Sequence, residues 1–250
     1  MDENVLYART LDDQEYVANM INKYGLVAIP IIDHEDCLVG IVTVDDAMLV
    51  LQDETTEDIS IMAGVSPNED SYFGTSVFQH AKNRSLWLML MMLSATVTGE
   101  ILGYYENAMA AMPVLITFIP MLMGTGGNCG SQSSTLVIRG LAVGEIEFRD
   151  ILRVIFKEIR IALIVGVLLS VVNGIRIYIM YDKNIMLAAA LGITMIAVVA
   201  MAKCIGCILP LTAKKLGLDP AIMAAPLITT ILDTCTILVY FNIVTAFFHI

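Results

Sequence analysis

The stretch of residues 220–250 is almost continuously hydrophobic, and Asp233, near its middle, is its only formal charge. About 20 such residues suffice for a helix that crosses a bilayer, so the stretch predicts a membrane-spanning helix. An ionised carboxylate at bilayer depth costs roughly 2.5 kcal/mol or more. We therefore interpret Asp233 as a candidate functional residue that faces a water-filled path or a counter-ion.

The whole chain is unusually apolar, since 57% of its residues are hydrophobic, against about 45–50% in soluble domains. Hydrophobic segments of spanning length lie at about residues 86–105, 113–138, 154–181, 185–213 and 220–250. They predict a mainly α fold in which residues 86–250 form a five-helix transmembrane domain in a lipid bilayer.

Acidic residues are concentrated before these segments. Sixteen of the 25 acidic residues lie in residues 1–70, where Arg9 and Lys23 are the only basic residues. Such a head argues against nucleic acid as a partner and favours cations. The chain shows no basic stretch followed by an apolar run and a small-residue cleavage site, so we expect no cleaved signal peptide and a cytoplasmic head.

Basic residues predict the orientation of the spans, because cytoplasmic flanks carry an excess of Lys and Arg. With the head inside, the outer flanks hold only Arg176 and Lys183. We expect a multi-pass protein of the cytoplasmic (inner or plasma) membrane, with a cytoplasmic N-terminus and an extracellular or periplasmic C-terminus. The cytoplasmic flanks then hold Lys82, Arg84, Arg139, Arg149, Arg153, Lys157, Arg160, Lys214 and Lys215.

Residues 1–53 predict a compact α/β unit. Asp12 and Asp13 can cap a helix that Gly25 ends, and β-branched strands at residues 27–32 and 38–42 precede a second helix at about 44–52. The strings at residues 28–33 and 40–46 resemble a CBS domain. CBS domains usually come in pairs and only one fits here, so we expect the chain to be part of a longer protein.

Residues 54–85 are expected to form an acidic linker and a connecting helix. Glu54, Glu57 and Asp58 have the spacing that puts three carboxylates on one helical face, and these repel one another unless a cation neutralises them. The alternative is a solvated linker with no bound ion.

The second hydrophobic segment contains the string Met-Gly-Thr-Gly-Gly-Asn-Cys-Gly-Ser-Gln at residues 123–132. So many glycines, beside Asn128, favour either unwound backbone or a very close approach of another helix. Unwound backbone at membrane depth is tolerated where it is buried in protein or lines a water-filled cavity. A phosphate loop is excluded, because no Lys follows and no strand precedes the glycines.

In the fifth segment, Asp219 and Asp233 are fourteen residues apart. On a helix they lie about 40° from a common face and about 21 Å apart, so we place Asp219 at the cytoplasmic mouth and Asp233 near mid-membrane. Hydroxyls such as that of Thr230 add oxygen ligands, which suit Mg²⁺ or Ca²⁺. The alternative for Asp233 is an ion pair with Lys203 of the fourth segment.

Two further strings make a specific resemblance. Residues 120–135, and residues 216–221 with 229–233, are similar to the second and fifth helices of the MgtE family of magnesium channels, also called magnesium transporters. With the CBS unit and the five spans, the resemblance covers residues 1–250.

The resemblance implies a homodimer with its pore at the two-fold axis, and Mg²⁺ as both the transported and the regulatory ion. It implies a channel for Mg²⁺ influx that closes when intracellular Mg²⁺ binds the acidic head. Whether ATP binds the CBS unit is not decided by the resemblance. The implied pore residues are Asp233, Asp219, Asn128, Gly127 and Thr230. The implied metal-sensor residues are Asp13, Glu15, Asp46, Glu54, Glu57 and Asp58.

Other functions are weighed against this one. A secondary carrier (exchanger or symporter) of divalent cations such as Co²⁺ or Mn²⁺ would also use broken helices at the midplane, and a CBS-type, nucleotide-regulated membrane protein would bind nucleotide without ion flux. An enzyme is not expected, because His34, His80 and His249 are scattered and have no evident Ser or Cys partner.

Overall fold

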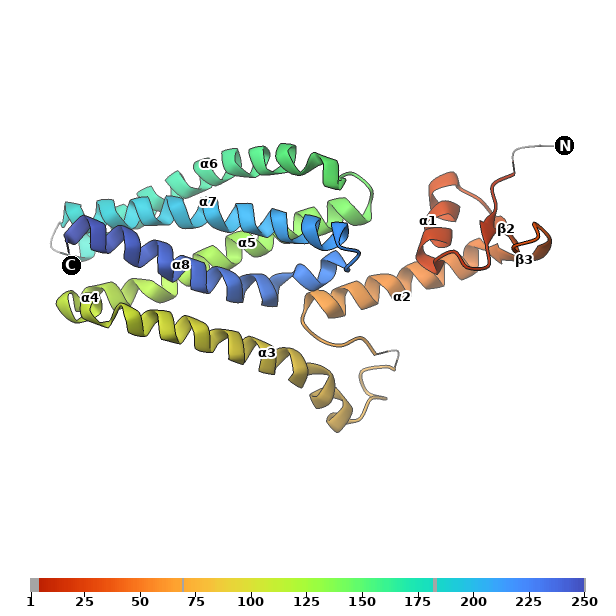
Figure 1. Cartoon of the computed structure of the whole chain (residues 1–250), viewed down its shortest axis with the longest axis horizontal. Coiled ribbons are helices and arrows are strands. Elements are labelled where there is room, and N and C mark those ends of the chain that lie inside the picture. The colour runs from red at the N-terminus through yellow and green to blue at the C-terminus, as the bar shows by residue number, and fades with distance from the viewer. Residues whose placement is uncertain (1–4, 69, 182–183, 250) are drawn as a thin grey trace. The chain divides into compact units, whose positions relative to one another are not determined.

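The structure is a computed structural model that describes residues 5–68, 70–181 and 184–249. The chain divides into two compact units, Met1–Ser60 and Ile61–Ile250, which we call the amino-terminal unit and the membrane unit (Figure 1). Lys183, counted above with the outer basic residues, lies outside the described residues.

The amino-terminal unit packs α1 (Gln14–Tyr24) and the first turns of α2 (Val44–Met62) against a three-stranded mixed sheet. The Asp13 side chain accepts a hydrogen bond at the start of α1, and Gly25 ends the helix in the left-handed conformation, as predicted. Both predicted strands and the first helix are therefore confirmed. The strands are β1 (Ala8–Arg9), β2 (Ala28–Ile32) and β3 (Leu38–Thr43), with β1 parallel and β3 antiparallel to β2.

The second helix, α2 (Val44–Met62), is longer than predicted. It continues without interruption through Glu54, Glu57 and Asp58, so the predicted boundary at residues 53 and 54 falls inside one helix. One contact ties this part of α2 to the rest of the amino-terminal unit, since Gln14 donates to the Glu54 carboxylate at 3.0 Å. The three carboxylates consequently do share a helical segment.

The membrane unit contains a long helix at each of the five predicted segments. Three of them are long and apolar enough to cross a membrane: α3, α7 and the segment Pro220–Phe248. That the other two long helices, α5 and α6, cross the membrane stays a prediction. The helices of this unit are α3 (Val77–Tyr104), α4 (Glu106–Ala111), η1 (Pro113–Phe118), α5 (Ile119–Ala142), η2 (Phe148–Asp150), α6 (Ile151–Met180), α7 (Ile185–Lys215), η3 (Pro220–Met223) and α8 (Ala225–Phe248).

Helix α7 lies at the centre of the membrane unit, where it contacts α5, α6 and α8. Half of its most apolar stretch is buried inside the unit, against 6% for α3, which packs mainly on α8 at the edge (Figure 1). Most of the surface of α3 is thus left for lipid or for a partner.

A buried hydrogen bond holds the second half of α8 in place: the Tyr240 hydroxyl donates to the Leu115 carbonyl at 2.9 Å.

Candidate functional site

The glycine-rich segment lies where α5 meets α8 and α7. Unwound backbone is the wrong alternative, because α5 is helical throughout this segment. A Cβ atom added at Gly126 would lie 2.7 Å from the Thr236 hydroxyl, and one added at Gly127 would lie 3.2 Å from the Thr229 methyl group. An added Cβ at Gly130 would overlap the Leu232 side chain. The glycines therefore serve the other alternative, a very close approach of neighbouring helices.

Asp233 lies on α8 one turn beyond Thr229, the residue that packs on Gly127. Its side chain is partly buried. Among the residues that the structure describes, none forms an ion pair or a hydrogen bond with the Asp233 carboxylate. Among the described residues, the protein thus supplies no cation to this carboxylate, which leaves it available to a cation from solution.

Lys203, the alternative partner of Asp233, has a different partner. Its ammonium lies 3.4 Å from the Glu158 carboxylate of α6 and 3.2 Å from the Ser133 hydroxyl of α5. Ser133 donates to the same carboxylate oxygen at 2.7 Å. The predicted alternative, a pair between Lys203 and Asp233, is therefore wrong. We call Ser133, Glu158 and Lys203 the buried triad.

Two hydroxyl residues flank Asp233 on α8 and face α3. Thr230 donates to the Pro226 carbonyl at 2.9 Å and contacts the Met91 sulfur at 3.0 Å. The Thr234 hydroxyl lies 2.7 Å from that of Thr98. Both hydroxyls therefore have protein partners, and their oxygens can still accept a hydrogen bond from a water molecule.

Asp219 lies at the other end of this segment, as the N-cap of η3. Its carboxylate accepts a hydrogen bond from the Ala221 backbone N–H at 2.8 Å and is only partly buried. This cap explains locally why Asp precedes Pro here. The contact occupies one carboxylate oxygen, so the other can still face a passing ion.

Asn128 is exposed on the outer face of α5, together with Gly124, Gln132, Thr135 and Arg139. Their spacing of four, four, three and four residues puts them on one side of the helix, and we call them the α5 polar stripe. Sequence reasoning named only Asn128 from this stripe as a pore residue, although the helical period of Asn128 and Gln132 could have extended the set. A polar stripe on a membrane helix is expected to face water or protein, because lipid disfavours it.

The predicted sensor residues have local structural contacts in the amino-terminal unit. Asp13 accepts from the Glu15 backbone N–H at 2.9 Å, and the Thr43 hydroxyl donates to Asp46 at 2.6 Å. The hydrogen bonds from the Thr43 hydroxyl and backbone lower the pKa of Asp46 below its ordinary value. In the described residues of the single chain, no three His, Cys, Asp or Glu side chains gather closely enough to hold a metal ion.

Comparisons with known proteins identify relatives of this arrangement. The family model MgtE, described as a divalent cation transporter, matches residues 119–243, which include nearly all of α5 to α8. The chain is 37% identical to the magnesium transporter MgtE of Thermus thermophilus over 243 residues, 97% of this chain and 54% of the relative.

Two further relatives are similar over the same extent. The magnesium transporter MgtE of Bacillus subtilis is 37% identical over 249 residues, 100% of this chain and 54% of the relative. That of Enterococcus faecalis is 34% identical over 250 residues, 99% of this chain and 54% of the relative. The chain spans about half the length of the curated relatives it matches.

Proposed function

Because the chain belongs to the MgtE family of divalent cation transporters, we propose that it lets Mg²⁺ cross the cytoplasmic membrane along a path that passes Asp233. The matched region contains Asp233, Asp219, Asn128, Gly127 and Thr230. The family is one of transporters and not of enzymes, which agrees with the absence of a catalytic constellation in the sequence.

The observation that carries this proposal is the Asp233 carboxylate, which has no cationic partner among the described residues. Mg²⁺ gives up its water reluctantly, so proteins usually hold it through waters with one or two carboxylates. Asp233, with the nearby hydroxyls of α8, provides oxygen ligands for a hydrated ion. Among the residues that the structure describes, Cys235, which is partly buried, is the one Cys or His within two positions of Asp233 in the sequence. Oxygen ligands therefore outnumber the softer ligands that a softer metal would prefer.

We also propose a homodimer whose two-fold axis passes the α5 polar stripe. A two-fold interface uses the same surface patch on both subunits, so the two Asn128 side chains and the two Asp233 carboxylates would line one path. Such pairing would cover polar groups that lipid disfavours. A secondary carrier would use a broken helix at the midplane. Because α5 is continuous through the glycine-rich segment, we prefer a channel.

The gating proposal rests on the acidic amino-terminal unit. Mg²⁺ that binds the closed arrangement more tightly shifts the population toward it, and carboxylates brought together across the dimer would supply that difference. Since a single chain does not gather three metal ligands in its described residues, the sensor would need the partner or the further residues of a longer protein. Replacing Glu54, Glu57 and Asp58 together by Gln and Asn should weaken inhibition of flux by internal Mg²⁺. An unchanged inhibition curve in patch recordings would refute this part alone.

The decisive experiment measures Mg²⁺ uptake by the 250-residue chain in proteoliposomes that contain a fluorescent Mg²⁺ indicator. Asp233→Ala should abolish uptake, and Asp233→Asn, which keeps the size of the side chain, should lower it at least about tenfold, equivalent to about 1.4 kcal/mol. The matched control is Asp70→Asn, an exposed carboxylate outside the long helices, which should transport normally. Wild-type uptake by Asp233→Asn and Asp233→Ala would overturn the proposed path.

A further inference from the structure

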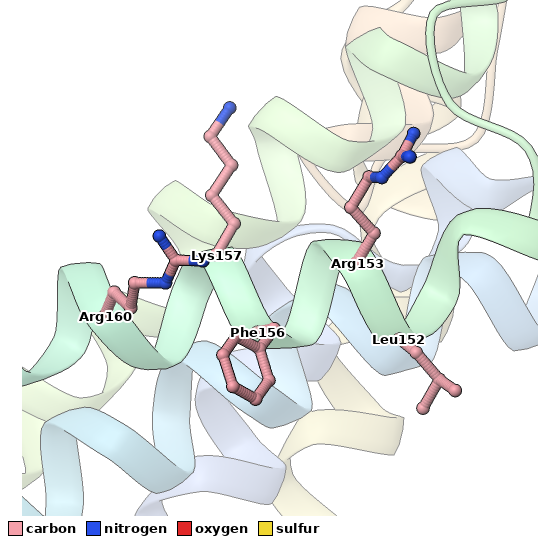
Figure 2. A pocket seen from close by; sticks show the side chains of 5 residues that line it. All are labelled: Leu152, Arg153, Phe156, Lys157 and Arg160. Atoms are coloured by element: carbon pink, nitrogen blue, oxygen red, sulfur yellow. The ribbon is translucent and has the colours of Figure 1, made fainter.

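The first turns of α6 carry a shallow pocket on the exposed surface of the membrane unit, with a volume of about 620 Å³. Figure 2 shows Arg153 and Lys157 projecting to one side of the helix, Leu152 and Phe156 to the other, and Arg160 lying along the helix. At 100° per residue the five positions span an arc of about 140°, so a basic stripe and an apolar stripe run side by side. The lining residues are Leu152, Arg153, Phe156, Lys157 and Arg160.

Most of the positive charge in this pocket is not neutralised by the protein. Arg153 lies 3.7 Å from the Asp150 carboxylate, with its side chain 87% exposed. Lys157 and Arg160 have no carboxylate partner among the described residues, and Arg160 instead lies over the Phe156 ring, 5.5 Å from its centroid. The nearest acidic residue on the helix, Glu158, is buried in the triad and cannot serve.

The apolar half of the pocket is exposed as well. Leu152 is 77% exposed and Phe156 is 65% exposed. Beyond Arg160, the outward positions of α6 are all apolar for the next two turns: Leu163, Ile164, Val167 and Leu168. The pocket therefore lies where the helix surface changes from basic to apolar. On a membrane helix, this change marks the level of the lipid headgroups.

We propose that this pocket binds one anionic phospholipid, whose phosphate lies between Lys157 and Arg160 and whose acyl chains follow Leu163, Ile164 and Val167 toward the membrane interior. Charge complementarity favours an anionic headgroup over a zwitterionic one. The exposed apolar stripe favours a lipid over a free phosphate ion, since a free ion gains nothing from it. This lipid site does not depend on the proposed transport of Mg²⁺.

The test measures binding of short-chain phosphatidylglycerol to the full chain in detergent by native mass spectrometry. Removing two cations near an anionic headgroup should cost about 1 kcal/mol each, so Lys157→Gln/Arg160→Gln should bind about thirtyfold more weakly than wild type. Lys157→Arg/Arg160→Lys, which keeps both charges, should bind like wild type. Leu163→Ser/Ile164→Ser should also bind more weakly, because the acyl chains lose their contacts.

The matched control removes the same charge elsewhere. Lys82→Gln/Arg84→Gln changes two exposed cations in the first turns of α3 and should leave binding unchanged. An equal loss in this control would overturn the site in favour of general charge attraction. Equal binding of phosphatidylcholine and phosphatidylglycerol by wild type would overturn the proposed preference for an anionic headgroup. If inorganic phosphate competed as strongly as the lipid, the identification of the ligand as a lipid would be wrong. Unchanged thermal unfolding of the lipid-free variants would show that they fold.

Discussion

The buried triad predicts that the ion pair between Lys203 and Glu158 is costly to break from one side. The two charged side chains are only 7% and 10% exposed, and their nearest atoms are 3.4 Å apart. At an effective dielectric constant of about 20, such a pair attracts by about 5 kcal/mol. Much of this attraction offsets the cost of burying the charges, but a charge left without its partner keeps that cost in full.

We therefore expect Lys203→Met to destabilise the membrane unit by about 3–5 kcal/mol, because Glu158 would stay buried without a cation. The double variant Lys203→Met/Glu158→Met should lose far less, about 1–2 kcal/mol, since apolar residues of similar volume often replace a buried pair at little cost. Its remaining loss comes from the Ser133 hydroxyl, which would have neither of its two partners.

The assay is a double-mutant cycle on unfolding of the chain by denaturant in mixed micelles, followed by circular dichroism. Ser133→Ala serves as the control, because it removes a hydroxyl and no charge and should cost about 1–2 kcal/mol. A coupling energy of at least about 2 kcal/mol between the two charged positions is expected. Strictly additive losses would contradict the buried pair, even if both single variants were unstable.

Two further perturbations follow from the contacts. Gly206→Ala should destabilise by about 3 kcal/mol or more, because its Cβ would meet the Gly130 backbone carbonyl, whereas Gly99→Ala, with open space around it, should cost nothing in the same unfolding assay. The lowered pKa of Asp46 contributes stability that is present above its unfolded pKa and is lost as the pH falls through the lower folded pKa. Thr43→Val should therefore raise the Asp46 pKa in an NMR titration of a labelled chain, and a pKa that does not move would refute the role of the Thr43 hydroxyl.

Local sequence signals predicted the amino-terminal unit well. Asp13 and Gly25 mark the ends of α1 because capping and the left-handed conformation depend on single residues. The length of α2 was not predicted, because its second half is a polar stretch that suits a solvated linker as well as a helix. Its partner Gln14 lies 40 residues from Glu54 in the sequence. Local composition describes how a segment suits water and does not say which distant side chain it meets.

The glycine-rich segment shows the same limit at the candidate site. Glycine disfavours a helix by about 1 kcal/mol per residue relative to Ala, which made unwound backbone a reasonable alternative for α5. Packing decides against it, because Gly126, Gly127 and Gly130 allow α8 and α7 to approach too closely for any larger side chain. The sequence shows which positions lack a side chain. It does not show which neighbouring helices pack into the space that these glycines leave.

The partner of Lys203 has a consequence for the proposed ion path. Glu158 is 45 residues away on another helix, so helical spacing within α7 or α8 could not identify it. Had Lys203 paired with Asp233, the carboxylate would already be neutralised and would attract a cation weakly. The triad holds Lys203 in a pair of zero net charge, so it adds little repulsion toward a cation, and it leaves the Asp233 carboxyl without a protein cation in the described residues. Because Lys203 pairs with Glu158 and not with Asp233, the structural role of the triad and the proposed role of Asp233 are separate. Lys203→Met should leave Mg²⁺ uptake per folded molecule intact, while Asp233→Asn should abolish or severely lower it in a fully folded protein.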